Sequence, residues 1–499
     1  MFDNIAEKSA TMLQKPLQLV VRSQSADLET PISIYLKLAD ESPSFLLESV
    51  SGGEQVARYS FIGISPRKAY VLRGNTLMTH ENGHINQREV SDPLAALSAE
   101  LEKMRSEHVS GLPRFTGGLA GYLGYEMMRF FEPSVDLQSH ESMPDAIFLM
   151  ADTIIAFDHA FGKLMLIATP RSDMDEAAAQ AEAESRLDTI QEQIAGPLPS
   201  ATSSSRQPGV GKFQNKKMQS NMTAAQFMQS VVQAKEHIAA GDIFQVVLSQ
   251  RLSRETNAQP FDVYRALRRL NPSPYMFYFD FGNLTGGEPL HLIGASPEMH
   301  VRYEEGVAAL RPIAGTRIRG KDAAEDQLLA DDLMADPKER AEHVMLVDLA
   351  RNDLGRVCDY GSVHVPELMQ VERYSHVMHI VSKVEGALRL EMDAFALMRA
   401  TFPAGTVSGA PKIRAMQIID NLEQDQRGPY AGAVGYFGAD GSMDTCIAIR
   451  TLIMQGKQIS VQAGAGIVAD SDPESEYQET MNKARALAVA VEMAEQDME

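Results

Sequence analysis

Hydrophobic and polar residues follow two different periods along this chain. Short alternating runs, ARYSFIGI at 57–64 and KAYVLRG at 68–74, predict strands, and IFQVVLSQRL at 243–252 predicts another. Runs with apolar residues three and four positions apart predict helices at 92–108 and 224–242. Strands and helices are interspersed without a regular strand–helix repeat. We therefore expect an α+β fold with large antiparallel sheets.

The most apolar stretch, AIFLMADTIIAFDHAFGKLMLIA at 146–168, predicts two strands joined by a turn. Asp152, Asp158, His159 and Lys163 interrupt it. These charged and polar side chains exclude a transmembrane helix.

A run dense in Pro, Gly and Ser, GPLPSATSSSRQPGVGKFQNKK, follows a helical pattern at 172–195 and is the clearest linker in the chain. A chain of 499 residues exceeds the usual size of a single core, so we expect two domains or one large composite domain. The boundaries predicted are an N-terminal region at 1–200, a linker at 201–217 and a C-terminal region at 218–499.

The charge balance limits the partners. The chain has 46 Lys and Arg against 67 Asp and Glu, a net charge of -21, which excludes nucleic acid and anionic membranes as general partners. The N-terminus lacks the apolar segment of a secretory signal. Cys358 and Cys446 lie far apart without metal-type spacing, as suits a reducing compartment. We expect a soluble cytoplasmic protein.

Two E-x-x-E pairs stand behind Asp-Pro dipeptides. In DPKERAEHV, Asp336 suits a helix N-cap and Pro337 the first helical position. The sequence DPESEYQET repeats this layout. The carboxylates are Glu339 and Glu342 in the first pair and Glu476 and Glu479 in the second, where Lys483 shares their helix face. Such pairs supply the oxygen ligands that Mg²⁺ prefers, but two unrelated capped helices would show the same spacing.

Several longer strings identify a family. From about 220 to 485 the chain contains, in order, IGASPEMHV, RPIAGTRIRG, ERAEHVMLVDLARNDLGRV, YSHVMHIVSKVEG, TFPAGTVSGAPKIRAM, RGPYAGAVGYFG, TCIAIRT and QAGAGIVADSDPESEYQET. It resembles the chorismate-utilising enzymes, most closely the members that form anthranilate. The resemblance implies two large antiparallel sheets packed as a sandwich, flanked by helices around a deep active site.

The resemblance also implies roles for individual residues. Mg²⁺ would bind between the two E-x-x-E helices, mainly at Glu342 and Glu479, with Glu339 and Glu476 serving directly or through water. Glu298 would protonate the departing C4 hydroxyl, and His379 would act in the loss of pyruvate. The residues that would contact chorismate are Thr406, Tyr430, Arg450, Gly464, Gly466 and Lys483.

Two positions distinguish the branches of the family. Relatives that make 4-amino-4-deoxychorismate carry a nucleophilic lysine where this chain has Ala314, beside Gly315 and Thr316 at the substrate. Relatives that add water carry a lysine base where this chain has Gln245. The resemblance therefore implies addition of ammonia and elimination of pyruvate to give anthranilate, the first committed step of tryptophan biosynthesis. This chain lacks a glutaminase-type cysteine motif, so a separate glutamine amidotransferase subunit is implied in a hetero-oligomer.

Two further segments resemble the halves of the tryptophan-feedback pocket of the family. Their residues are Glu48, Ser49, Arg58, Pro274, Tyr275 and Met276. Two alternatives to the anthranilate-forming activity stay open: a 4-amino-4-deoxychorismate synthase component, and a non-catalytic homologue that binds chorismate or tryptophan as a regulator.

Overall fold

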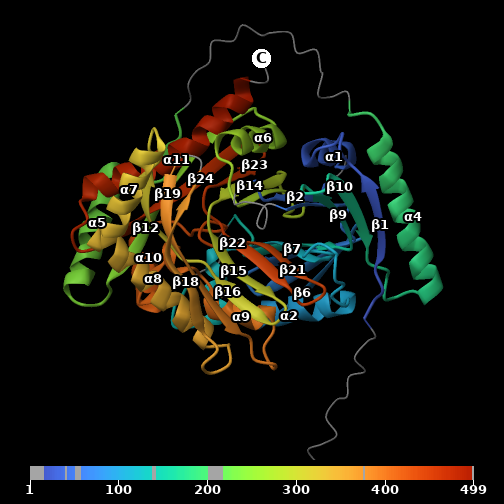
Figure 1. Ribbon diagram of the computed structural model, residues 1–499, viewed down its shortest axis with the longest axis horizontal. Helices are drawn as coiled ribbons and strands as arrows, with labels where there is room; N and C mark the ends of the chain where they lie inside the picture. Colours follow the sequence, from blue (N-terminus) through green and yellow to red (C-terminus); the bar gives the residue numbers. More distant parts are fainter. Residues whose placement is uncertain are drawn as a thin grey trace, which may run out of the picture.

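Figure 1 shows the computed structural model, which describes residues 16–39, 42–50, 58–137, 142–199, 217–374 and 377–496. The linker predicted at 201–217 lies outside these residues except for Lys217. Within the described part, the strands form two large sheets and every strand pair is antiparallel. The predicted α+β class and its antiparallel two-sheet sandwich are confirmed.

The first sheet contains, in spatial order, β1 (Val20–Ser25), β10 (Lys163–Ala168), β9 (Thr153–Asp158), β3 (Tyr59–Ile64), β2 (Ser44–Glu48), β13 (Tyr275–Asp280), β14 (Leu290–Ser296), β23 (Thr451–Gln455), β24 (Gln458–Ile467), β12 (Gln245–Glu255) and β11 (Gln219–Ser220), with β20 (Gly409–Ala410) beside β12.

The second sheet contains β17 (Ile313–Ile318), β19 (Val377–Ala387), β16 (Val307–Leu310), β15 (Met299–Glu304), β22 (Met443–Ile447), β21 (Ala433–Gly438), β7 (Gly118–Leu123), β8 (Ala146–Ala151), β4 (Lys68–Arg73), β5 (Thr76–Glu81) and β6 (His84–Glu89), with β18 (His364–Arg373) beside β19.

Both sheets combine strands from the two predicted regions. In the first sheet β2 pairs with β13, and in the second β7 pairs with β21. The chain is therefore built as one composite architecture, which is one of the two organisations expected from its length. The division at 201–217 stays a prediction.

The apolar stretch at 146–168 forms three strands, so the prediction of two was wrong. β8 belongs to the second sheet, whereas β9 and β10 belong to the first. The chain changes sheet at Asp152, which lies 3.3 Å from Arg186. β8 and β9 are buried along their whole length, so no polar alternation marks the break between them.

Helices cover the outer faces and one end of the sandwich (Figure 1). They are α1 (Pro31–Leu38), α2 (Pro93–Leu101), α3 (Met128–Phe131), α4 (Glu176–Ala195), α5 (Ala224–Ala239), α6 (Pro260–Leu270), α7 (Ala323–Ala335), α8 (Pro337–Gly355), α9 (Ala394–Thr401), α10 (Lys412–Leu422) and α11 (Pro473–Gln496), with 3-10 turns η1 (Glu102–Met104), η2 (Tyr125–Met127) and η4 (Gly405–Val407). In the described part, no helix is both long and apolar enough to cross a membrane.

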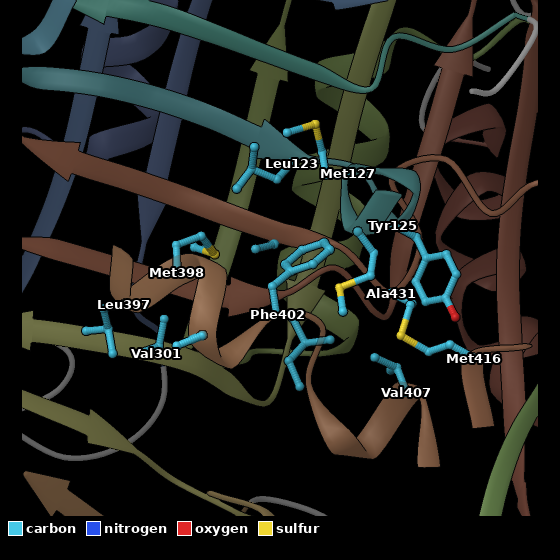
Figure 2. Close-up of a cluster of buried hydrophobic side chains, with 14 of the residues drawn as sticks. Leu123, Tyr125, Met127, Val301, Leu397, Met398, Phe402, Val407, Met416 and Ala431 are labelled. Atoms are coloured by element: carbon cyan, nitrogen blue, oxygen red, sulfur yellow. The ribbon is translucent and has the colours of Figure 1, made fainter. Parts of the chain in front are cut away.

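The hydrophobic core of the described residues has three large layers and a small fourth cluster of Ala330, Leu333, Met378 and Ile380. The sheets meet over Phe45, Phe279, Tyr122 and Ile147, all buried. A second layer joins the first sheet to α1, α4, α6 and α11. A third joins the second sheet to helices on its far side, and Figure 2 shows part of it. This third layer packs directly behind the candidate site.

Candidate functional site

The predicted site residues gather at one end of the sandwich, where β12 and β24 meet the first turns of α8 and α11. A cavity there is lined by six of the predicted residues: Thr406, Tyr430, Arg450, Gly464, Gly466 and Lys483. A smaller adjoining cavity is lined by Glu298, Arg311 and Thr406, among others. Thr406 in η4 borders both cavities, so it lies at the centre of the site.

Glu298 lies in the short link between β14 and β15 and is buried. Its Oε1 accepts a hydrogen bond of 2.6 Å from Oγ1 of Thr406. Burial raises the pKa of Glu298 to about 8, although the Thr406 hydrogen bond acts in the opposite direction. The carboxyl group is therefore protonated at neutral pH and can donate a proton.

Arg450 and Tyr430 line the larger cavity. Arg450 lies between β22 and β23 with a φ of 52°, a left-handed conformation that side chains other than glycine rarely adopt. Burial lowers the pKa of the Arg450 guanidinium, whereas the nearby Tyr430 and Glu479 act to raise it. In the described part of the chain no carboxylate forms an ion pair with Arg450. Arg450 is thus a half-buried cation available to an anionic ligand.

The glycines of β24 are required by close packing. A Cβ on Gly464 would lie 2.7 Å from the Tyr430 hydroxyl, and one on Gly466 would lie 2.6 Å from Nε2 of Gln245. Lys483 of α11 donates from Nζ to the Gly464 carbonyl at 2.8 Å and lies 2.6 Å from Glu479. β24 and α11 are thereby connected at the cavity wall.

His379 lies on β19, opposite the β17 segment that carries Ala314, Gly315 and Thr316. Its Nδ1 is 2.8 Å from the Gly315 carbonyl oxygen and 3.2 Å from Oγ1 of Thr316. Burial lowers the pKa of His379, so the ring is neutral at pH 7. Because a carbonyl only accepts, Nδ1 carries the proton and Nε2 keeps its lone pair.

The predicted helix starts are confirmed. Asp336 accepts hydrogen bonds from the backbone N–H groups of Lys338 and Glu339, and Pro337 is the first residue of α8. At the start of α11, Asp472 accepts a hydrogen bond of 3.0 Å from the N–H of Ser475. Lys338 of α8 lies 3.8 Å from Asp470, just before α11, so the two helix starts are neighbours.

The glutamates of each pair repel one another. Burial and the charge of Glu342 raise the pKa of Glu339, although Arg317 lies 3.4 Å from it. Burial and the charge of Glu479 likewise raise the pKa of Glu476. Glu342 accepts a hydrogen bond of 3.1 Å from Gln245.

The structure does not bring the two glutamate pairs together into one ligand set. Among the described residues, no three Asp, Glu, His or Cys side chains converge as they would around a bound metal ion. Each pair nevertheless holds a half-buried carboxylate, Glu339 in one and Glu476 in the other, whose repulsion by the neighbouring glutamate a divalent cation would relieve. The chemistry of the donor set therefore fits Mg²⁺.

A separate cavity lies between the sheets and is lined by most of the predicted inhibitor-binding residues. Met276 of β13 pairs directly with Glu48 of β2, so two segments more than 200 positions apart become neighbours. The lining includes Glu48, Ser49, Pro274, Tyr275 and Met276. Oγ of Ser49 is buried and has no hydrogen-bond partner in the described structure.

Two of the predicted inhibitor-binding residues are already engaged. The buried Glu48 carboxylate accepts hydrogen bonds from Arg268 at 2.9 and 3.1 Å and from the Tyr264 hydroxyl. Arg58 is 3.0 Å from Asp158 and is not part of the lining.

The sequence analysis missed residues that line the inter-sheet cavity and one residue behind the active-site cavity. Arg114, Tyr436 and Asp444 line the inter-sheet cavity; no local pattern marks Arg114 or Asp444, whereas Tyr436 lies within the RGPYAGAVGYFG string. Behind the active-site cavity, the buried Arg427 was not singled out even though it stands three residues before Tyr430 in the RGPYAG string. Its position inside a family string was the available signal.

Comparisons with known proteins find one family model, related sequences and related structures. A model of the chorismate binding enzyme family matches residues 42–489. Anthranilate synthase component 1 of Pseudomonas putida is 45% identical over 477 residues, which cover 94% of both chains. The protein of the same name from Aquifex aeolicus is 47% identical over 478 residues, covering 95% of this chain and 94% of its own.

Solved structures show the same fold. The crystal structure of anthranilate synthase component I from Streptococcus pneumoniae superposes with a TM-score of 0.74 and 38% identity, covering 93% of this chain and 98% of that one. The menaquinone-specific isochorismate synthase MenF of Escherichia coli has a TM-score of 0.69 and 22% identity, covering 95% of each chain. The second likeness concerns the fold alone.

Proposed function

The chain belongs to the family of chorismate-binding enzymes, and on this basis we propose that it converts chorismate and ammonia to anthranilate and pyruvate. This is the reaction of a carbon–oxygen lyase that opens tryptophan biosynthesis. The observation that carries the proposal is the buried, protonated Glu298 beside a cavity containing an unpaired arginine.

Chorismate carries two carboxylates, and the larger cavity offers cations for them. Arg450 presents a guanidinium fork suited to two parallel hydrogen bonds with a carboxylate, and Tyr430 adds a hydroxyl donor. We assign these two residues to the enolpyruvyl carboxylate. Lys483 and the close backbone of Gly464 and Gly466 complete the wall.

Glu298 supplies the proton that the departing C4 hydroxyl needs. Its raised pKa keeps the proton on the carboxyl group at neutral pH, and Thr406 holds Oε1 in place. The hydroxyl then leaves as water while ammonia attacks C2. Ala314 cannot act as a nucleophile on the ring, which argues against the lysine-dependent reaction. Gln245 cannot deprotonate water, which argues against addition of water, so ammonia is the favoured nucleophile.

His379 serves the second half of the reaction, in which the ring loses a proton and pyruvate leaves. The hydrogen bond from Nδ1 to Gly315 holds the ring and leaves Nε2 as the acceptor. The lowered pKa of His379 keeps that acceptor free of a proton at neutral pH.

Magnesium is the cofactor proposed. Glu342 and Glu479 would hold the ion, with Glu339 and Glu476 contacting it directly or through water, because burial and the neighbouring carboxylate raise the pKa of Glu339 and Glu476 and a cation would offset both effects. When bound, the ion would neutralise and orient the ring carboxylate of chorismate. In its absence, Arg317 and Lys483 partly balance Glu339 and Glu479.

A partner subunit supplies the ammonia in this proposal. The relatives are called component 1, which implies a second component. We infer a glutamine amidotransferase, since this chain has two cysteines and both are buried with a raised pKa, unlike a nucleophile. Free thiols also suit the cytoplasm, where we place the reaction.

Tryptophan is the proposed inhibitor at the inter-sheet cavity. The unpartnered Ser49 hydroxyl is a free polar group there, and Tyr436, Phe61 and Met276 provide apolar walls for an indole ring. Because Arg268 and Tyr264 already satisfy Glu48, its contribution would require a rearrangement of that ion pair.

One assay tests the reaction. The purified chain is given chorismate, Mg²⁺ and ammonium at alkaline pH, and anthranilate fluorescence and pyruvate are followed. We expect both products in equal amounts. Accumulation of an aminodeoxychorismate would identify the other ammonia-using branch, and binding of chorismate without turnover would identify a regulator.

A further inference from the structure

A buried ion pair lies directly behind the larger cavity. Arg427 and Glu423 are joined by hydrogen bonds from Nε to Oε2 at 2.8 Å and from Nη2 to Oε1 at 2.6 Å. The side chains are 2% and 7% exposed. Neither residue lines the cavities described above. A buried ion pair stabilises a protein little more than apolar residues of the same volume would. The stability of the fold therefore does not explain this pair, but the groups that it orients can.

Arg427 uses its remaining N–H groups to join two cavity walls. Nη1 donates to the carbonyl of Val407 at 2.7 Å, and Nη2 donates to the carbonyl of Val247 at 2.8 Å. Val407 follows Thr406 in η4, and Val247 is two residues after Gln245 in β12. The planar guanidinium therefore sets the distance between these two segments.

Glu423 extends the same network to β24. Its Oε1 accepts hydrogen bonds from the N–H and the hydroxyl of Ser249 at 2.8 and 2.9 Å. The Ser249 hydroxyl in turn accepts from Nε2 of Gln462 at 2.9 Å. Ser249 pairs across the sheet with Gly464. The backbone of Gly464 at the cavity is thus tied to the ion pair.

The segment carrying Tyr430 is held as well. The Arg427 guanidinium stacks over the rings of Tyr125 and Tyr430, 4.6 and 5.5 Å from their centroids. The backbone N–H groups of Arg427 and Gly428 donate to the buried Glu126 carboxylate at 2.7 and 3.0 Å. Figure 2 shows Tyr125 together with Val407 and Ala431, the neighbours of Thr406 and Tyr430 in the chain.

We propose that Arg427 and Glu423 are a pair of positioning residues, which fix Thr406, Tyr430 and Gly464 relative to one another and so set the geometry at Glu298. Arg427 acts chiefly through the Val407 carbonyl on Thr406, the donor to Glu298. The catalytic part of this inference rests on the proposed function, whereas the structural part does not.

Arg427→Lys is the informative variant, because lysine keeps the charge near Glu423 and loses the fork that reaches Val407 and Val247. The matched control is Arg254→Lys. Arg254 also forms a two-bond pair with a glutamate, Glu495, at 3.0 Å for each bond, but at the opposite end of β12. We expect Arg427→Lys to lower kcat/KM for chorismate about tenfold or more, as loss of charge-assisted hydrogen bonds does. Arg254→Lys should retain wild-type kcat/KM at a similar loss in melting temperature.

A double-mutant cycle with Thr406→Val separates positioning from general loosening. If Arg427 acts through Thr406, Arg427→Lys lowers kcat much less in the Thr406→Val background than in the wild type. Additive losses in kcat would overturn the proposal. An equal loss of kcat/KM in Arg254→Lys would also overturn it.

Hydrogen exchange gives a readout that does not depend on turnover. Arg427→Lys should speed amide exchange in peptides covering 404–408 and 428–431, while Arg254→Lys leaves these peptides unchanged. Unchanged exchange there in Arg427→Lys contradicts the structural part. If exchange changes as expected but the wild type makes no anthranilate, the proposed function fails and the positioning role stands.

A second variant covers the case in which Arg427→Lys does not fold. The double replacement Arg427→Met with Glu423→Gln removes both charges, so no unpaired charge stays buried. It should fold, show the same faster exchange at 404–408, and have a raised KM for chorismate. Wild-type KM and exchange in this variant would refute the proposal.

Discussion

The Thr406 hydroxyl donates a 2.6 Å hydrogen bond to the carboxyl group of Glu298, although the two residues are 108 positions apart in the chain. Glu298 belongs to the link between β14 and β15, and Thr406 to η4. Burial at this point raises the pKa of Glu298 to about 8. Burial therefore keeps Glu298 a proton donor at neutral pH even though the Thr406 hydrogen bond lowers its pKa, and the first two predictions concern this group.

Glu298→Gln removes the proton donor and keeps the size of the side chain. We expect kcat to fall by roughly 10²–10⁴-fold while chorismate still binds, since general acid catalysis contributes about that much. In the wild type, kcat should decline as pH rises through about 8, because Glu298 loses its proton there. Steady-state kinetics between pH 6 and 9.5 measure both effects. A wild-type kcat that stays flat across pH 8, or an active Glu298→Gln, would remove Glu298 from this role.

Glu298 also makes stability depend on pH. The carboxyl group of Glu298 has its ordinary pKa of 4.5 in the unfolded chain, whereas burial raises its pKa to about 8 in the folded chain. Between pH 4.5 and 8 the folded state binds more protons at Glu298 than the unfolded state does. As the pH rises through this range, this group therefore lowers the free energy of unfolding by at most ~1.4 kcal/mol per pH unit. The melting temperature of Glu298→Gln should therefore increase relative to that of the wild type as the pH rises from 5 to 8. If the difference in melting temperature between the two proteins is the same at pH 5 and pH 8, the result contradicts a raised pKa of Glu298.

Arg450→Lys tests recognition of the enolpyruvyl carboxylate. Lysine cannot form the two parallel hydrogen bonds of a guanidinium, so KM should rise about 10–100-fold with a smaller change in kcat. Arg485→Lys is the control, since Arg485 is exposed on the same helix as Lys483. Initial rates over a range of chorismate concentrations give both constants. An unchanged KM in Arg450→Lys would place the carboxylate elsewhere.

Glu342→Gln and Glu479→Gln test the metal site. Each removes one carboxylate, so Mg²⁺ affinity measured by titration calorimetry should fall at least about tenfold, with loss of Mg²⁺-dependent turnover. Glu474→Gln, which changes an exposed glutamate in the first turn of α11, should bind Mg²⁺ as the wild type does. Direct binding separates loss of metal from loss of catalysis. Equal affinity in all three variants would refute the assignment.

Ser49→Phe tests the regulatory cavity. The substitution removes the unpartnered Ser49 hydroxyl and puts a phenyl ring into the inter-sheet cavity, where it would exclude tryptophan. The tryptophan concentration for half inhibition should therefore rise at least about tenfold. The rate without tryptophan should stay close to that of the wild type, because Ser49 does not line either cavity of the active site. Met276→Thr, on the paired strand, should act in the same direction. An inhibition curve that neither change moves would place the tryptophan site elsewhere.

The sequence by itself determined most local structure and the family. Asp336 and Pro337 predicted the start of α8 because capping depends only on neighbouring residues, and the strings from IGASPEMHV to QAGAGIVADSDPESEYQET identified a chorismate-binding enzyme. It predicted two strands at 146–168, where there are three, because strands buried along their whole length lose the alternation that marks their ends.

Only the tertiary structure decided which distant residues meet and which are removed from water. It placed Met276 beside Glu48, engaged Glu48 with Arg268 and Tyr264, and brought Arg427 behind Tyr430 and Thr406. The raised pKa of Glu298 belongs to the same class, since desolvation comes from segments packed around it. Periodicity and capping depend on residues that are close together in the chain. Strand pairing and burial depend on distant residues that come together only when the whole chain folds.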